Sequence, residues 1–170
     1  LFSADDHDNT ISGGTIDDTV HFSTGSNATW TLLGDLTING DLSIGSDCTL
    51  STGGFDLTVS SSLSIFGHLE AEGSSVIDIG EDFLQYDGDA DFSANSSTLI
   101  FRGTDSVCTV NSQSGSFNDL IIPAGAALDC DTGAGANPNY WNNVTISGEW
   151  SVDYDGPDGT VYLGPSAVIS

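Results

Sequence analysis

The chain contains no lysine, no methionine and a single arginine, Arg102. Against this one basic residue stand 21 aspartates and 4 glutamates, so the formal net charge is −24. Nucleic acids and anionic membrane surfaces are recognised largely through basic side chains, so the composition argues against both as partners. The sequence also has no run of 18 apolar residues, and we therefore expect no insertion into a membrane.

Strongly acidic chains are often disordered, because they cannot bury enough apolar surface to fold. Here 38% of the 170 residues are hydrophobic, and they recur in a regular pattern that favours a folded domain. Carboxylates at this density need counterions, which either a salty medium or bound divalent cations can supply. The net charge alone does not distinguish these two sources.

The regular pattern appears when residues 34–50 are shifted by 21 positions onto residues 55–71. Short apolar–polar–apolar triplets then coincide, and each predicts a strand with both apolar side chains on one face. The residues between triplets are small and polar, as is typical of turns. The matching triplets are Leu36-Thr37-Ile38 with Leu57-Thr58-Val59, and Leu42-Ser43-Ile44 with Leu63-Ser64-Ile65. A shift near 20 extends the pattern to Ile77-Asp78-Ile79 and Phe83.

Three such strands and three corners make a circuit of about 21 residues, a period typical of solenoids. We therefore predict an all-β fold, a parallel β-solenoid with three short strands per coil. Residues 1–170 are expected to form one domain. Its expected parts are a less regular segment (1–30), regular coils (31–101), and looser coils with a C-terminal strand (102–170). A β-sandwich is the alternative, but it does not explain the constant shift.

Later in the chain the shift lengthens to 24, where Phe117 falls on Trp141 and Ile122 on Ile146. Three stretches, "ATWTLLGDLTINGDLSIGSDCTL", "SANSSTLIFRGTDS" and "SGSFNDLII", resemble β-solenoid repeats of secreted bacterial and archaeal surface proteins. Autotransporter-like and filamentous-haemagglutinin-like adhesins belong to this group. The resemblance covers roughly residues 28–146 and rests on stacking and turn motifs. It implies a right-handed parallel β-helix, outside the cell or at its surface, that acts as a spacer, adhesin or assembly subunit.

Two further features agree with an extracellular location. The chain begins at Leu1, which we interpret as a mature N-terminus after signal removal or as the start of a fragment. Three N-glycosylation sequons begin at Asn27, Asn95 and Asn143. Such triplets also arise by chance in a chain rich in Asn, Ser and Thr.

The acidic turns suggest one cofactor, calcium, although no motif requires a cofactor. Ca²⁺ prefers carboxylate and carbonyl oxygens held on tight loops. The stretch "DYDGPDG" offers Asp153, Asp155 and Asp158 around two glycines, without the full EF-hand spacing. A second hypothetical site uses the stretch "DGDAD". Its carboxylates are Asp87, Asp89 and Asp91. Solvated turn aspartates are the alternative at both places.

The three cysteines are Cys48, Cys108 and Cys130. Cys108 and Cys130 are 22 residues apart, about one coil, which places them within the range that a disulfide can bridge. An oxidising exterior would favour that bond, and buried thiols are the alternative. We expect Cys48 to be a small buried apolar residue.

We expect no enzymatic activity. Some β-helices cleave polysaccharides with a basic residue or with paired carboxylates. Here the only basic residue for a lyase is Arg102, and no carboxylate pair stands out among 25 acidic residues.

Two functional hypotheses remain. The first is a subunit that polymerises with copies of itself, because the sequence shows no helical or charged cap and ends in an alternating apolar strand. The residues expected to make this contact are Val161, Leu163, Ala167 and Ile169. The second is an adhesin or fibre module that binds surface glycans or a receptor. Its candidate aromatic residues are Trp30, Trp141, Trp150 and Tyr154.

Overall fold

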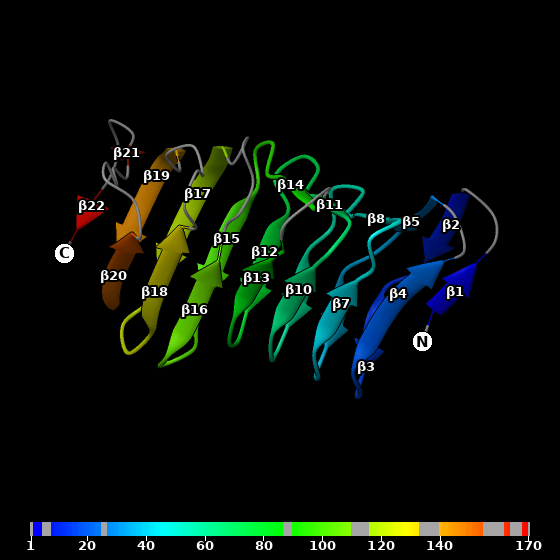
Figure 1. Ribbon diagram of the computed structural model, residues 1–170, viewed down its shortest axis with the longest axis horizontal. Helices are drawn as coiled ribbons and strands as arrows, with labels where there is room; N and C mark the ends of the chain where they lie inside the picture. The colour runs from blue at the N-terminus through cyan, green and yellow to red at the C-terminus, as the bar shows by residue number, and fades with distance from the viewer. Residues whose placement is uncertain are drawn as a thin grey trace.

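The fold is a parallel β-solenoid, in which neighbouring strands of each sheet come from successive coils (Figure 1). The structure is a computed structural model that describes residues 2–4, 8–24, 27–86, 90–109, 116–132, 140–154, 162–163 and 168–169. All elements in these residues are strands, so none of the described segments is a helix of the length and hydrophobicity needed to cross a bilayer.

The strands form three sheets, which we name A, B and C. Sheet A contains β1 (Phe2–Ala4), β4 (Val20–Thr24), β7 (Leu42–Ile44), β10 (Leu63–Ile65), β13 (Phe83–Gln85), β16 (Ser106–Thr109), β18 (Ala127–Thr132) and β20 (Glu149–Tyr154). Sheet B contains β2 (Asp8–Ile11), β5 (Ala28–Leu32), β8 (Cys48–Ser51), β11 (His68–Glu70) and β14 (Asp91–Ser93). Sheet C contains β3 (Gly14–Ile16), β6 (Leu36–Ile38), β9 (Leu57–Val59), β12 (Val76–Ile79), β15 (Thr98–Phe101), β17 (Ser116–Ile122), β19 (Tyr140–Ile146), β21 (Tyr162–Leu163) and β22 (Val168–Ile169).

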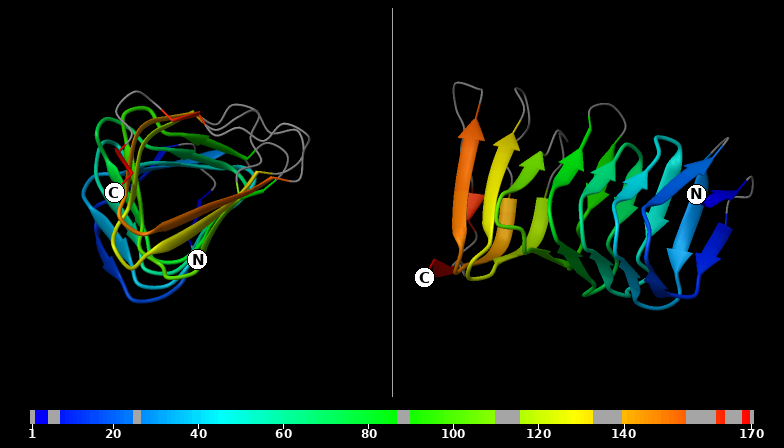
Figure 2. Two further views of the ribbon diagram at one scale, coloured as in Figure 1. Left: turned by 90° about the vertical axis from the view of Figure 1, so that its left-hand side faces the viewer. Right: turned by 90° about the horizontal axis from the view of Figure 1, so that it is seen from below.

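In each of the first five coils the chain passes through sheets A, B and C in turn, which confirms the three-strand coil. The view along the axis shows a three-sided cross-section (Figure 2, left). From β16 onwards the described strands belong to sheets A and C only; they alternate up to β21, and β22 also joins sheet C. The first and last coils lie at opposite ends of an elongated body (Figure 1).

The strand register confirms the repeat found in the sequence. Leu36 pairs with Leu57, and Leu42 with Leu63, at the expected shift of 21 residues. The longer shift near the C-terminus is also confirmed, since Phe117 pairs with Trp141. Pairing begins earlier than the regular segment expected from residue 31, because β1 already pairs with β4.

The core is a set of apolar rows that run from coil to coil. In sheet C one row holds an aliphatic residue in each of six successive strands, and every member is at most 1% exposed. Its members are Leu36, Leu57, Ile77, Leu99, Leu120 and Val144. Aromatic rings fill the wider parts of the interior, where Phe83 packs edge-on against both Phe92 and Phe101. Such edge-to-face pairs add about 1 kcal/mol each beyond the area that they bury.

The corners are joined by polar side chains that bond to the next coil. Asp35 Oδ1 accepts the backbone N–H of Asp56 at 3.0 Å, and Asp56 Oδ1 accepts the N–H of Val76 at 2.8 Å. Across another corner, Asp82 Oδ1 accepts the N–H of Val107 at 2.8 Å. These carboxylates satisfy backbone donors at turns, which gives part of the high aspartate content a structural role.

Candidate functional site

The ends of the solenoid are the first candidate for a functional surface. In β3, the N–H of Gly14 donates to Asp35 O at 2.8 Å, and Ile16 O accepts the N–H of Asn39 at 2.9 Å. Both contacts face the neighbouring strand β6. Because backbone groups of successive strand residues point to opposite sides, the N–H and C=O of Thr15 point away from β6, towards the outer edge of sheet C.

The edge of sheet B has the same arrangement. Ile11 O accepts the N–H of Leu33 at 2.7 Å, on the side of β5. The backbone groups of Thr10 therefore point outwards from β2. Thr10 and Thr15 are both exposed, and neither strand has a second described neighbour. This end thus presents backbone donors and acceptors of the kind that recruit another strand.

The opposite end differs from the sequence prediction. One alternating strand was expected to continue to Ser170, but the described residues form two short strands, β21 and β22. Both pair with β19, β21 at Tyr140–Trp141 and β22 at Thr145–Ile146, so they lie one after the other along the same edge. Leu163 lies in β21 and Ile169 in β22, whereas Val161 and Ala167 lie outside the described residues.

The calcium hypotheses remain predictions. Asp153 lies in β20 and pairs with Asp131, but Asp155 and Asp158 lie outside the described residues. Asp87 and Asp89 also lie outside them. Within the described part of the chain, no three His, Cys, Asp or Glu residues are grouped as a metal site.

Asp91, the remaining member of the second hypothetical calcium site, begins β14 and pairs with His68 on β11. Its Oδ2 accepts a long hydrogen bond of 3.5 Å from Ser93 Oγ. This contact engages one oxygen of the Asp91 carboxylate, and the serine brings no second carboxylate to the hypothetical calcium site.

The structure brings Cys108 and Cys130 together, as their spacing predicted. They pair directly across β16 and β18, both side chains are buried, and both are free thiols. The disulfide therefore remains a prediction. Cys48 is buried in β8 opposite Ala28, in agreement with its expected role as a small core residue.

The three sequon asparagines occupy different settings. Asn27 and Asn95 are exposed and have positive φ angles of 41° and 46°, as in tight turns. Asn95 Nδ2 donates to Ala71 O at 3.1 Å, and Asn143 Nδ2 donates to Asp119 Oδ1 at 2.5 Å. A glycan on Asn143 would disturb this half-buried contact between coils, whereas Asn27 stands on an outer corner.

Of the four aromatic residues suggested for ligand binding, the structure describes the side chains of Trp30 and Trp150, and these two do not share an exposed surface. Trp30 is 8% exposed and packs against Phe22 in the core. Trp150 is half-buried and donates its Nε1–H to Cys130 Sγ at 3.3 Å. The side chains of Trp141 and Tyr154 lie outside the described set.

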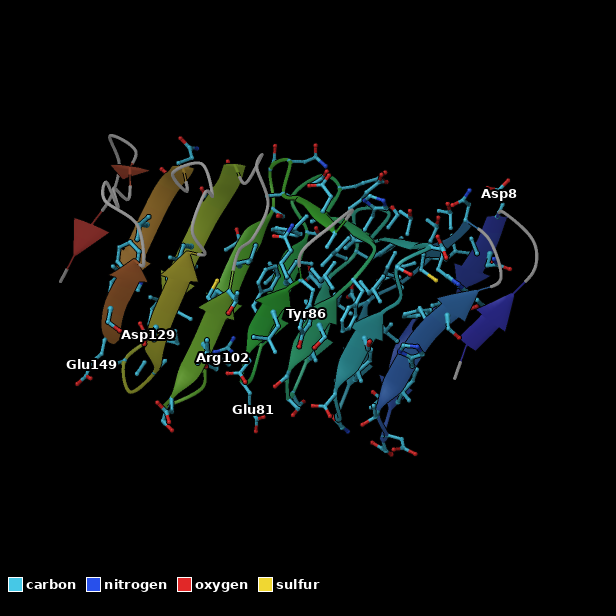
Figure 3. The ribbon with its side chains drawn as sticks, in the orientation of Figure 1. Asp8, Glu81, Tyr86, Arg102, Asp129 and Glu149 are labelled. Carbon is cyan, nitrogen blue, oxygen red and sulfur yellow. The ribbon has the colours of Figure 1, made fainter. Side chains whose placement is uncertain are left out.

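A different aromatic pair is exposed on the side of the solenoid. Phe66 and Tyr86 are each 40% exposed, and their rings stack with centroids 4.1 Å apart and planes within 5°. Both follow the last residue of a sheet A strand, Ile65 and Gln85, which pair in register. The sequence carried this signal, because two aromatic residues 20 positions apart occupy equivalent corners of successive coils. Tyr86 is labelled in Figure 3.

Arg102 is held by a carboxylate on the neighbouring strand. Its Nη2 lies 2.6 Å from Asp78 Oδ2, and its Nε is 2.7 Å from both carboxylate oxygens (Figure 3). The hydrogen bond to Asp78 raises the pKa of Arg102. A guanidinium held in this way is a poor proton acceptor, so the geometry does not favour a lyase base.

The surface near the last coils has a shallow depression of about 330 Å³. Asp105, Asp129, Glu149 and the half-buried Trp150 contribute to its walls. Figure 3 shows Glu149, like Glu81, projecting outwards at a corner of its coil. Asp129 is engaged locally, since its Oδ1 accepts the Ser151 hydroxyl at 2.8 Å.

Comparison with protein-family models, with curated proteins and with solved structures finds no match for this chain. The parallel β-solenoid fold therefore rests on the strand pairing described above.

Proposed function

We propose that this chain is an extracellular structural protein, a subunit that assembles head to tail with further copies into a surface filament or sheath. The observation that carries the proposal is the edge of β3, where the backbone groups of Thr15 point away from the sheet. We also propose, from the resemblance of the repeat motifs, that the chain is related to autotransporter-like or haemagglutinin-like secreted proteins.

The geometry of parallel sheets suits this kind of contact. Every described strand pair is parallel, so in sheets A and C, whose described strands reach both ends of the solenoid, the N-terminal edge is complementary to the C-terminal edge, as each strand is to the next. A second copy placed along the axis would continue the sheets in the same direction. Such a head-to-tail contact does not close on itself, and it therefore produces a fibre rather than a ring.

Charge favours end contacts over side contacts. Carboxylates crowd the corners and sides, and the described residues contain a single Arg–Asp ion pair, between Arg102 and Asp78. Sides that carry like charge repel one another at low ionic strength. Contacts at the ends depend instead on backbone hydrogen bonds and a few buried aliphatic side chains. Thin single filaments are therefore favoured over lateral aggregates.

The alternative function, a glycan-binding adhesin module, is favoured by the exposed Phe66–Tyr86 stack. Flat aromatic rings bind the apolar C–H faces of sugars. Binding to a neutral polysaccharide that is lost on Phe66→Ala or Tyr86→Ala would support this alternative. Phe55→Ala, which removes another exposed aromatic ring, is the matched control.

The test is electron microscopy together with sedimentation velocity of the full chain across NaCl and Ca²⁺ concentrations. We expect thin filaments with a spacing of about 4.8 Å between strands along the axis. Sheet A has eight strands, so each subunit should add about 38 Å of filament length. A chain that sediments as a monomer under every condition would overturn the proposal.

The sequence suggested a second experiment, deletion of residues 160–170 to block assembly. The structure changes this design, because removal of β21 and β22 uncovers the seven-residue strand β19 as a new parallel edge. The N-terminal edge at Thr15 gives the sharper test.

A further inference from the structure

Sheet A contains an interior row that changes its chemistry near the C-terminal end. In successive coils the row holds Leu42, Leu63 and Phe83, and then Cys108 and Cys130. Cys108 is 0% exposed and Cys130 is 3% exposed, and the other three members of the row are also buried. Two smaller polarisable groups therefore stack where earlier coils place large apolar side chains.

The two thiols are in direct contact. Residues directly opposite in neighbouring strands have Cα atoms about 5 Å apart, within the range that a disulfide bridges. The hydrogen bond between the two thiols raises the pKa of Cys108 well above its ordinary value. The same bond lowers the pKa of Cys130 against the opposing effect of burial, and the bond from Trp150 lowers it further.

Trp150 contacts one member of the pair, Cys130. It lies on β20, the last strand of sheet A, and its Nε1–H points at Cys130 Sγ at 3.3 Å. The shallow depression beside Trp150 is lined by Ser106 and Leu128, each two residues before one of the cysteines. Neither cysteine lines this depression, so we expect solvent and oxidants to reach the thiols from this corner only when the indole is displaced.

We propose that Cys108 and Cys130 form a disulfide that staples β16 to β18, and that Trp150 on β20 controls access to it. This inference is independent of the assembly proposed above. It assigns a redox modification site to the C-terminal coils, with Cys130 as the thiol that reacts first.

The oxidant is an external disulfide, such as oxidised glutathione or the disulfide of a thiol oxidoreductase. The Cys130 thiolate attacks one sulfur of that disulfide, forms a mixed disulfide and releases the other sulfur as a thiolate. The Cys108 thiol then loses its proton and attacks Cys130 Sγ, which releases the second thiolate. The chain loses two electrons and two protons, and the external disulfide becomes two thiols.

Burial sets the rate of this exchange. Because both sulfurs are covered, we expect slow oxidation of the native protein, and faster oxidation once β20 separates from β18. The bond closes a loop of about one coil, and a loop of this length should raise Tm by about 5–10 °C.

The test is oxidation of the reduced protein with oxidised glutathione, followed by mass spectrometry of chymotryptic peptides. We expect a mass loss of two hydrogen atoms and one linked peptide pair that contains Cys108 and Cys130. Cys48→Ala should give the same product, since Cys48 lies in sheet B opposite Ala28. A link that includes Cys48 would overturn the proposal, and so would thiols that alkylate readily but remain unlinked.

The role of Trp150 has its own readout, the rate of disulfide formation. Trp150→Ala should increase this rate about tenfold or more, whereas Phe55→Ala, which removes an exposed aromatic ring at the corner between β8 and β9, should leave it unchanged. In Cys108→Ser, which keeps the Trp150 bond to Cys130, glutathione should attach to Cys130 faster than it attaches to Cys108 in Cys130→Ser. Equal rates in wild type and Trp150→Ala would overturn the gating role even if the disulfide forms.

Discussion

Leu36 on β6 and Leu57 on β9 pair directly across sheet C, and both side chains are fully buried. The neighbours of Leu57 on either side are thus the equivalent residues of the adjacent coils, Leu36 and Ile77. Leu57→Asp would place an unpaired charge between two coils. We expect a loss of about 4 kcal/mol or more in the free energy of unfolding, measured by urea denaturation.

A charge-matched control lies on the same pair of strands. Thr37 follows Leu36 but points outwards, and its neighbours are Thr15 and Thr58. Thr37→Asp should change stability by about 0.5 kcal/mol or less. Equal losses in the two variants would contradict the inward and outward assignment of side chains.

The corner aspartates should stabilise the coils individually. Asp56 Oδ1 accepts the N–H of Val76, so Asp56→Ala leaves this donor to water and should cost about 1 kcal/mol. Asp105→Ala removes the same charge from an exposed turn before β16 and should be neutral or slightly stabilising, because it reduces repulsion. Thermal melts of both variants at low salt measure the difference. Equal effects would mean that net charge alone governs the corners.

Stability should rise with NaCl, because salt screens the repulsion among 25 carboxylates. If Ca²⁺ binds at Asp153, Asp155 and Asp158, Ca²⁺ should raise Tm above the value in NaCl of equal ionic strength. Asp155→Asn with Asp158→Asn should remove this difference. Identical melting curves in the two salts would leave screening as the sole effect.

The sequence predicted the fold well, because the determinants of a solenoid are local. A triplet such as Leu36-Thr37-Ile38 indicates where a strand lies, which of its side chains point into the core and which position it takes in the coil. The 21-residue shift then indicates the strand with which it pairs. The pairing of Cys108 with Cys130 followed from the same arithmetic. The length of the coil was enough to predict both the pairing of the triplets and the pairing of the two cysteines.

What the sequence did not predict depends on packing between corners and strands. Trp30 was a candidate binding residue because it is aromatic, but it packs against Phe22 in the core. The sequence places Phe66 and Tyr86 one coil apart, but only the packing of the two corners shows that their rings stack. The local pattern also did not predict that β21 and β22 pair with two separate parts of β19.

The central claim, assembly through the edge of β3, is tested most directly by Thr15→Pro. Proline removes the outward N–H of Thr15 and leaves the Gly14 and Ile16 bonds to β6 in place. Thr15→Val retains the N–H and the side-chain shape, and it is the matched control. Circular dichroism checks the fold of each variant.

Sedimentation velocity of these variants at a concentration where wild type forms filaments is the decisive measurement. The account predicts filaments for Thr15→Val and folded monomers for Thr15→Pro. Filaments of unchanged length and yield from folded Thr15→Pro would contradict it.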